Sequence, residues 1–143
     1  MAVLNQVQDD VKSALKAGDR ERVHALRLIA DALQKAEKDD GGDAVEVLQR
    51  ERKRRLEAAE AYADAGRGDA ADAEQREADI IASYLPEQIS DEELHAIVGD
   101  AVAESGASSP QEMGKVMGLV MPHVKGRADG KRVSAAVKEM LTP

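Results

Sequence analysis

The 143-residue sequence contains no cysteine, no phenylalanine and no tryptophan. Because it lacks cysteine, it has no disulfide, no thiolate metal ligand and no cysteine nucleophile, which is typical of proteins from a reducing compartment. No apolar run approaches the roughly 20 residues that a membrane-spanning helix requires. Asp9 and Asp10 interrupt the N-terminal segment before the apolar block of a secretory signal forms. We therefore expect a cytoplasmic protein with no membrane partner.

Aromatic residues make up only 1% of the chain, although 43% of it is hydrophobic. Alanine is the commonest hydrophobic residue, so few bulky side chains remain to fill a core. Long helices that pack through small residues suit this composition better than a sandwich of sheets. Alternating, strand-like patterns are weak, whereas apolar residues recur at helical spacing along most of the chain. The sequence therefore predicts an all-α fold.

Glycine and proline divide the helical pattern into about seven segments. Gly18, Gly66 and Gly106 follow apolar stripes and are predicted helix ends, and the run Asp39-Asp40-Gly41-Gly42 is predicted to break another helix. Pro86 marks the main boundary, because a residue that precedes proline is disfavoured in the helical region. We expect an N-terminal array of helical hairpins over residues 1–83, a linker over 84–89 and a small C-terminal three-helix domain over 90–143.

Helix starts carry recognisable capping residues. Ser90 and Glu93 form the sequence pattern of a capping box, in which each side chain bonds the other residue's backbone N–H. Ile89 and Leu94 occupy the two positions of a hydrophobic staple around this cap. The remaining N-caps are expected at Asp19, Asp43, Asp69 and Ser109.

Residue patterns that carry catalysis are missing. His24, His95 and His123 are far apart in the sequence, and none belongs to a metal-ligand motif. The pairs Gly114-Lys115 and Gly130-Lys131 lack the following Ser or Thr that a nucleotide-binding P-loop requires. We therefore expect no catalytic residue, no metal ion and no cofactor in this chain.

The charge of the chain is unevenly distributed. The net charge of −8 argues against a general nucleic-acid coat protein, because polyanion affinity comes largely from Lys and Arg. Residues 84–112 contain no Lys or Arg, whereas residues 113–143 carry six of them against two acidic residues. A local positive field in the C-terminal segment can therefore outweigh the negative total.

The most informative candidate site runs from Lys125 to Arg132, where glycines bound a basic loop that enters a helix. Backbone N–H groups at that helix start would add to the attraction for a phosphate. Lys115 would join the site if the two flanking helices pack together. The alternative is an ordinary capped turn whose basic side chains are solvated. The candidate RNA-binding residues are Lys115, Lys125, Arg127, Lys131 and Arg132.

A second candidate surface lies on the helix before this loop. Gly114 and Gly118 are four residues apart, and each glycine costs up to about 1 kcal/mol in a helix interior. Such a cost suggests close approach by a neighbouring helix or, as the alternative, by the backbone of another protein. The neighbouring stripe of Met113, Met117 and Met121 is either core or an adaptable docking surface. The candidate close-approach glycines are Gly114, Gly118, Gly126 and Gly130.

A basic run covers Arg50 to Arg55 and is interrupted by Glu51. Most of this run is interpreted as a solvated helix surface. Arg52 lies four residues after Leu48, on the apolar side of the helix, so we expect it to extend along the surface or to pair with an acid of a neighbouring helix.

Several of these segments together resemble the YqeY-like family, and the resemblance covers nearly the whole chain. The C-terminal motifs are Tyr84-Leu85-Pro86-Glu87-Gln88, Ser90-Asp91-Glu92-Glu93-Leu94, Gly106-Ala107-Ser108-Ser109, Met113-Gly114-Lys115-Val116-Met117 and Gly126-Arg127-Ala128-Asp129-Gly130. In the N-terminal half, Leu26-Arg27 and Gly66-Arg67 with Asp69 are similar to the family's pattern. Five C-terminal motifs in the right order are more specific than any of them alone.

The resemblance implies an all-helical protein similar to the C-terminal tail found in the glutamyl/aspartyl-tRNA amidotransferase. That tail is thought to contact tRNA, and its glycine and basic positions correspond to Gly114, Lys115, Gly126, Arg127 and Gly130. No catalytic residue corresponds, because the catalytic domain has no counterpart here. The first hypothesis is therefore a non-catalytic tRNA-binding or RNA-binding module. The alternatives are an accessory component of a carbon–nitrogen ligase that uses glutamine as amido-N-donor, and a protein-interaction module that uses the methionine and glycine helix.

Overall fold

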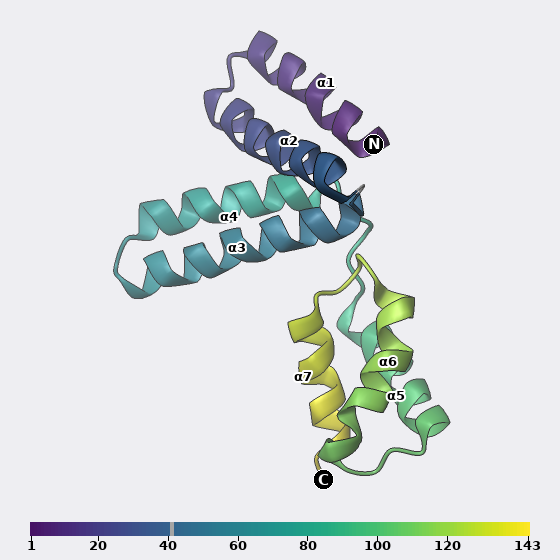
Figure 1. Ribbon diagram of the computed structural model, residues 1–143. Helices are drawn as coiled ribbons and strands as arrows, with labels where there is room; N and C mark the ends of the chain where they lie inside the picture. The colour runs from purple at the N-terminus through teal and green to yellow at the C-terminus, as the bar shows by residue number, and fades with distance from the viewer. Residues whose placement is uncertain (41) are drawn as a thin grey trace. The chain divides into compact units, whose positions relative to one another are not determined.

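A computed structural model describes residues 1–40 and 42–143. Seven α-helices and one short 3₁₀ helix lie within these residues, which include no strand, and the predicted all-α class is confirmed (Figure 1). None of the described helices is long and apolar enough to cross a bilayer. The helices are α1 (Ala2–Ala17), α2 (Arg20–Asp40), α3 (Ala44–Asp64), α4 (Gly68–Ala82), α5 (Asp91–Ser105), η1 (Pro110–Glu112), α6 (Met113–Val124) and α7 (Gly130–Leu141).

The chain forms two compact units, Met1–Pro86 and Glu87–Pro143. The first unit contains α1 to α4, and the second contains α5 to α7. Tyr84 and Leu85 pack against the core of the first unit, whereas Ile89 is buried in the core of the second. Each unit therefore has a hydrophobic core of its own.

In the N-terminal unit, α1 and α2 form an antiparallel hairpin that turns at Gly18 (Figure 1). Gly18 has a φ of +72°, the left-handed conformation that favours glycine, and it ends α1 as predicted. Asp19 accepts a hydrogen bond from the backbone N–H of Arg22 at 3.1 Å and thereby caps α2 as predicted. The apolar stripe of α2 is buried in this unit, and its largest fully buried side chains are Leu26, Ile29 and Leu33.

Helices α3 and α4 form a second antiparallel hairpin in the same unit (Figure 1). Asp43 caps α3 by accepting a hydrogen bond from the N–H of Val45 at 2.9 Å, as predicted. Helix α4 begins at Gly68 with Arg67 at the N-cap position, so the predicted cap at Asp69 is wrong. Asp69 lies instead in the first turn of α4, where a carboxylate still stabilises the positive end of the helix dipole.

The structure describes only part of the predicted helix break at Asp39-Asp40-Gly41-Gly42. Helix α2 extends to Asp40, and α3 begins at Ala44. Gly41, the centre of the predicted break, lies outside the described residues.

The α3–α4 hairpin contains a largely buried ion-pair network. The guanidinium of Arg55 donates to Glu51 at 2.8 Å and to Glu77 of α4 at 3.3 Å. The exposed Arg54 reaches the same Glu51 carboxylate at 3.3 Å. Arg52, for which a pairing across helices was one expectation, is half-buried and has no ion-pair partner among the described residues. The inter-helix pairing therefore belongs to Arg55.

The C-terminal unit begins with a well-capped helix. Ser90 accepts a hydrogen bond from the N–H of Glu93 at 3.1 Å, which is the first half of the predicted capping box. Ile89 and Leu94, the two staple residues, are both buried in the core. Ser109 and Glu112 form a complete, reciprocal capping box at η1, immediately before α6.

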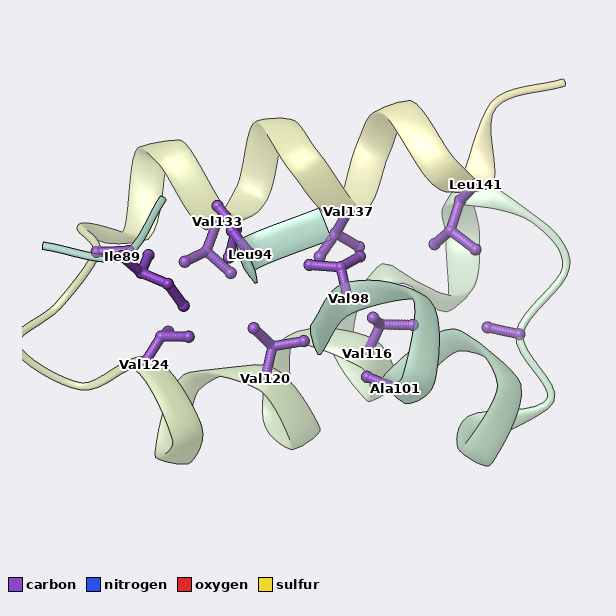
Figure 2. Close-up of a cluster of buried hydrophobic side chains, with 12 residues drawn as sticks. Ile89, Leu94, Val98, Ala101, Val116, Val120, Val124, Val133, Val137 and Leu141 are labelled. Atoms are coloured by element: carbon purple, nitrogen blue, oxygen red, sulfur yellow. The ribbon is translucent and has the colours of Figure 1, made fainter. Parts of the chain in front are cut away.

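Valine dominates the core of the C-terminal unit (Figure 2). Val116, Val120 and Val124 of α6 face Val133 and Val137 of α7, and all five have no exposed surface. Full burial of one such side chain stabilises the fold by about 1.5–3 kcal/mol, so this cluster is a main source of stability in a unit whose core contains no aromatic residue. The methionines of α6 are partly buried and pack at the edge of the cluster: Met113, Met117 and Met121.

Candidate nucleic-acid interface

The loop between α6 and α7 is held in place by the segment that precedes α5. The N–H of Ile89 donates to the carbonyl of Arg127 at 2.8 Å, and the side chain of Gln88 donates to the carbonyl of Gly126 at 3.0 Å. Gly126 is buried and has a φ of +79°, a conformation that L side chains rarely adopt. Ala128 is also buried. The backbone that carries the candidate cations is therefore fixed on both sides.

Both arginines of the loop region are ion-paired with acids at the start of α5. Arg127 contacts Glu93 at 3.2 Å and also donates to the carbonyl of Glu87 at 3.3 Å. Arg132 contacts Asp91 at 2.6 Å. The arginine side chains keep 35% and 31% of their surface exposed, and the Asp91 carboxylate is almost fully solvated at 96%. These contacts are exposed ion pairs, each worth about 0.2–1 kcal/mol.

The three lysines of the predicted site differ in their surroundings. Lys125 and Lys131 are exposed at the two sides of the loop. Lys131 has no hydrogen-bond or ion-pair partner among the residues that the structure describes. Lys115 is 67% exposed and lies 3.9 Å from Glu112, one turn before it. Hydrogen bonds from the backbone N–H groups of Ser108 and Ser109 lower the pKa of Glu112, so this carboxylate stays charged beside Lys115.

The expectation that Lys115 joins the loop cations is wrong. Lys115 lies in the first turn of α6, whereas the loop follows the last turn at Val124. Nine residues of α-helix separate them by about 14 Å along the axis. Because α6 and α7 run in opposite directions, the first turn of α6, which carries Lys115, lies towards the C-terminal end of α7 (Figure 1). The structure brings together Lys125, Arg127, Lys131 and Arg132 and leaves Lys115 apart.

The expected contribution of the α7 N-terminus is also corrected. Asp129 is the N-cap of α7 and accepts a hydrogen bond from the N–H of Arg132 at 2.7 Å. A carboxylate of the chain thus already satisfies one of the N–H groups that an external phosphate would bind at the helix start. Anion binding at this loop therefore depends mainly on the basic side chains.

The four candidate close-approach glycines have different surroundings. A Cβ added at Gly114, Gly118 or Gly130 would meet no described atom within 4 Å. Close approach by a neighbouring helix of this chain, the first interpretation of Gly114 and Gly118, is therefore wrong. Gly126 is needed for its left-handed backbone in the loop.

Sequence reasoning missed Asp91 and Glu93 as partners of the basic loop. It assigned the Glu93 side chain to a reciprocal capping box, but that carboxylate contacts Arg127 instead. One signal pointed to these pairs: an acidic segment over residues 84–112 is followed by a basic one over 113–143. Opposite charges in adjacent segments of a small domain favour such pairing.

Within the described residues, no group of three or more His, Asp or Glu side chains is arranged to hold a metal ion. His24, His95 and His123 are all exposed and lie on three different helices.

Comparison with known proteins agrees with the resemblance in the sequence. The profile of the family described as "Yqey-like protein" matches residues 4–141. A curated relative is the "Altered inheritance of mitochondria protein 41, mitochondrial" of Pyrenophora tritici-repentis. It is 26% identical over 147 residues, an alignment that covers 97% of this chain and 81% of the relative. Because the family profile spans both compact units, the chain belongs to the YqeY-like family.

Proposed function

We propose that the C-terminal unit binds RNA, with tRNA as the expected ligand, and that the chain itself makes and breaks no bonds. The observation that supports this proposal is the fixed α6–α7 loop, which gathers Lys125, Arg127, Lys131 and Arg132 on one exposed part of the unit. A rigid backbone lowers the entropy cost of placing cations against phosphates.

The ion pairs with α5 lower the expected affinity of this loop for RNA but do not prevent binding. Each pair is partly solvated and contributes about 0.2–1 kcal/mol, so a phosphate replaces the carboxylate at small cost. A phosphate contact also releases condensed counterions, which adds a favourable term that the internal pair lacks. We therefore expect modest affinity, with Lys131 as the first contact and the two arginines recruited by exchange.

The test is a titration of the purified full-length chain with bulk tRNA over a series of salt concentrations. If about four phosphates are neutralised, the logarithm of the association constant should fall with the logarithm of the salt concentration with a slope of roughly −3 to −4. Lys125→Glu combined with Lys131→Glu should abolish binding. Lys138→Glu is the matched control, because Lys138 is exposed on the same helix α7 but near its other end. Absence of binding at low ionic strength, or equal loss in the control variant, would refute the proposal.

A second test removes the acidic partners of the two loop arginines. Asp91→Asn and Glu93→Gln remove the competing charges but keep the hydrogen bond from the N–H of residue 93 to Ser90. Each change should tighten tRNA binding by about two- to fivefold, which corresponds to the free energy of one exposed pair. Circular dichroism should verify that the helices persist, because carboxylates in the first turn of α5 stabilise the helix by about 0.3–1 kcal/mol each. Unchanged affinity would show that the arginines do not reach the RNA.

An accessory role in glutamine-dependent amidation is a narrower form of the same proposal. In that case the chain would position mischarged tRNA while other proteins supply the chemistry. Its addition to a reconstituted tRNA-dependent amidotransferase should then raise the rate, and the Lys125→Glu, Lys131→Glu variant should not. We also propose that this chain is cytoplasmic. The name of the fungal relative places that relative in mitochondria.

The exposed glycines of α6 favour one further candidate, a protein-interaction module. Gly114 and Gly118 weaken a helix that no other part of the described chain approaches at these positions. An approaching backbone from another protein would use that space. Gly118→Leu should then abolish co-purification of a partner that resists nuclease treatment, whereas Lys115→Gln, on the same helix, should not.

A further inference from the structure

We propose that the outer face of the α1–α2 hairpin binds an acidic, amphipathic helical segment of another protein. The face is defined here by Leu15 at the end of α1 and by Arg20, His24 and Arg27 along α2. It belongs to the N-terminal unit, whereas the loop proposed to bind RNA belongs to the C-terminal unit.

The first observation is an exposed apolar side chain at a groove. Leu15 retains 52% of its surface, the larger value of the two large hydrophobic side chains exposed in the described chain. It borders a groove of about 360 Å³ that also contains Ala14 and Val23. The other exposed leucine, Leu28, retains 38% and borders a second groove next to the first, with His24 common to both. An apolar surface of this kind is a common feature of interaction sites.

The second observation is a set of cations without partners around this groove. Arg20 and Arg27 line it, and neither guanidinium has a hydrogen-bond or ion-pair partner among the described residues. This is unlike Arg55, Arg76 and Arg127, which are each paired with a carboxylate. In a chain with a net charge of −8, unpaired arginines beside an exposed leucine form a local positive field.

Helical geometry places these groups on one side of α2. Around an α-helix, His24 and Arg27 lie about 40° and 20° to either side of Arg20, so the three residues share one face. The opposite side of α2 is buried through Leu26, Ile29 and Leu33. The cationic face is therefore directed outward and lies beside Leu15 across the turn at Gly18.

The positive charge of this face indicates that its partner is acidic. An amphipathic helix with leucines along one stripe and carboxylates beside it would fill the groove with an aliphatic side chain and pair its acids with Arg20 and Arg27. RNA fits less well, because Ala14, Leu15 and Val23 give the groove an aliphatic lining, and His24 is the one aromatic ring in that lining on which a base could stack.

The experiment uses the full-length chain and three labelled synthetic peptides of about 16 residues. The first carries leucines at i, i+4, i+7 and i+11 with glutamates beside them, the second replaces the glutamates by glutamine, and the third replaces the leucines by serine. Fluorescence anisotropy should show binding of the first peptide, with at least tenfold weaker binding of the other two. Amide chemical shifts should change mainly over residues 12–28.

Variants then locate the site. Leu15→Gln, and separately Arg20→Gln combined with Arg27→Gln, should each weaken binding of the acidic peptide about tenfold, or about 1.4 kcal/mol. All three residues are exposed, so thermal unfolding should be nearly unchanged. Arg50→Gln is the matched control, because Arg50 is an exposed arginine of the same unit on α3. The proposal is overturned if the acidic peptide does not bind, if the serine peptide binds as well, if the control variant weakens binding equally, or if bulk tRNA shifts the same amides with equal or higher affinity.

Discussion

Replacement of Arg55 by methionine should destabilise the N-terminal unit far more than the same replacement of its neighbour Arg54. Arg55 is 15% exposed and joins the carboxylates of Glu51 and Glu77, which are 10% and 18% exposed. Methionine keeps the unbranched stem and the helix propensity but removes the charge. Arg55→Met therefore leaves two largely buried carboxylates, of which only Glu51 retains a partner among the described residues, the exposed Arg54.

The magnitude follows from this burial. Breaking a fully buried ion pair from one side costs about 3–5 kcal/mol, because the remaining charge stays desolvated. Here the groups keep some contact with water and Arg54 remains, so we expect about 2–3 kcal/mol. In a unit of this size, 1 kcal/mol shifts the midpoint of thermal unfolding by about 4–8 °C. Arg54→Met removes only a 64%-exposed partner and should cost about 0.2–1 kcal/mol.

Tyrosine fluorescence provides an assay that is specific for this unit. The chain has two tyrosines and no tryptophan, and both tyrosines, Tyr62 and Tyr84, lie within Met1–Pro86. Urea titrations that follow tyrosine emission therefore report the N-terminal unit alone, whereas far-ultraviolet circular dichroism reports both units. Equal losses in Arg55→Met and Arg54→Met would refute the assignment of Arg55 as the main partner of Glu51.

A double-mutant cycle tests the physical reason. Glu77→Leu should remove the carboxylate that Arg55→Met leaves unpaired, so Glu77→Leu combined with Arg55→Met should be more stable than Arg55→Met alone. Replacement of buried ion pairs by hydrophobic residues is often neutral or stabilising. A double variant whose loss equals or exceeds the sum of the two single losses would contradict the interpretation that desolvation sets the cost.

Three further predictions concern other parts of the chain. Gly118→Ala should stabilise the C-terminal unit by up to about 1 kcal/mol in denaturant titrations, because the added methyl group meets no described atom and alanine favours the helix. Ser90→Ala should destabilise the same unit by about 1 kcal/mol, because the N–H of Glu93 loses its acceptor, and amide exchange of Glu93 should accelerate. Burial and the hydrogen bond to Asp10 raise the pKa of Tyr84, so this tyrosine keeps its proton more strongly in the folded state than in the unfolded state. The N-terminal unit should therefore lose stability as the pH rises above about 10, the usual tyrosine pKa, and Tyr84→Phe should reduce this loss in alkaline unfolding experiments.

Local chemistry allowed most of the helical architecture to be predicted from the sequence. Gly18 and Asp19 define the end of α1 and the start of α2, because a left-handed glycine and a short carboxylate act on backbone atoms within a few residues. Ser90 and Ser109 act in the same way at the starts of α5 and η1. The prediction that Asp69 caps α4 was wrong, because several residues near a glycine can begin a helix. Helix α4 begins one residue earlier, at Gly68.

Long-range pairings could not be predicted in the same way. Glu93 had two partners available, its own N-cap and a guanidinium that lies 34 residues later in the chain, and only the packing of α5 against the loop selects Arg127. The choice of Arg55 over Arg52 likewise depends on how α3 is rotated against α4. Lys115 was grouped with the loop cations, although the direction of α6 places it at the other end of the unit.

These pairings change which cations are candidates for binding. In the sequence, the basic residues of the C-terminal segment look equivalent, and those of the N-terminal half look like solvated helix surface. In the structure, the loop arginines have carboxylates as first partners, whereas Lys131, Arg20 and Arg27 have none among the described residues. A ligand that pairs with an unpartnered cation displaces only water and counterions, whereas one that pairs with Arg127 must also displace Glu93. Binding measured at the loop should therefore respond to changes in Asp91 and Glu93, and binding measured at the α1–α2 face should not.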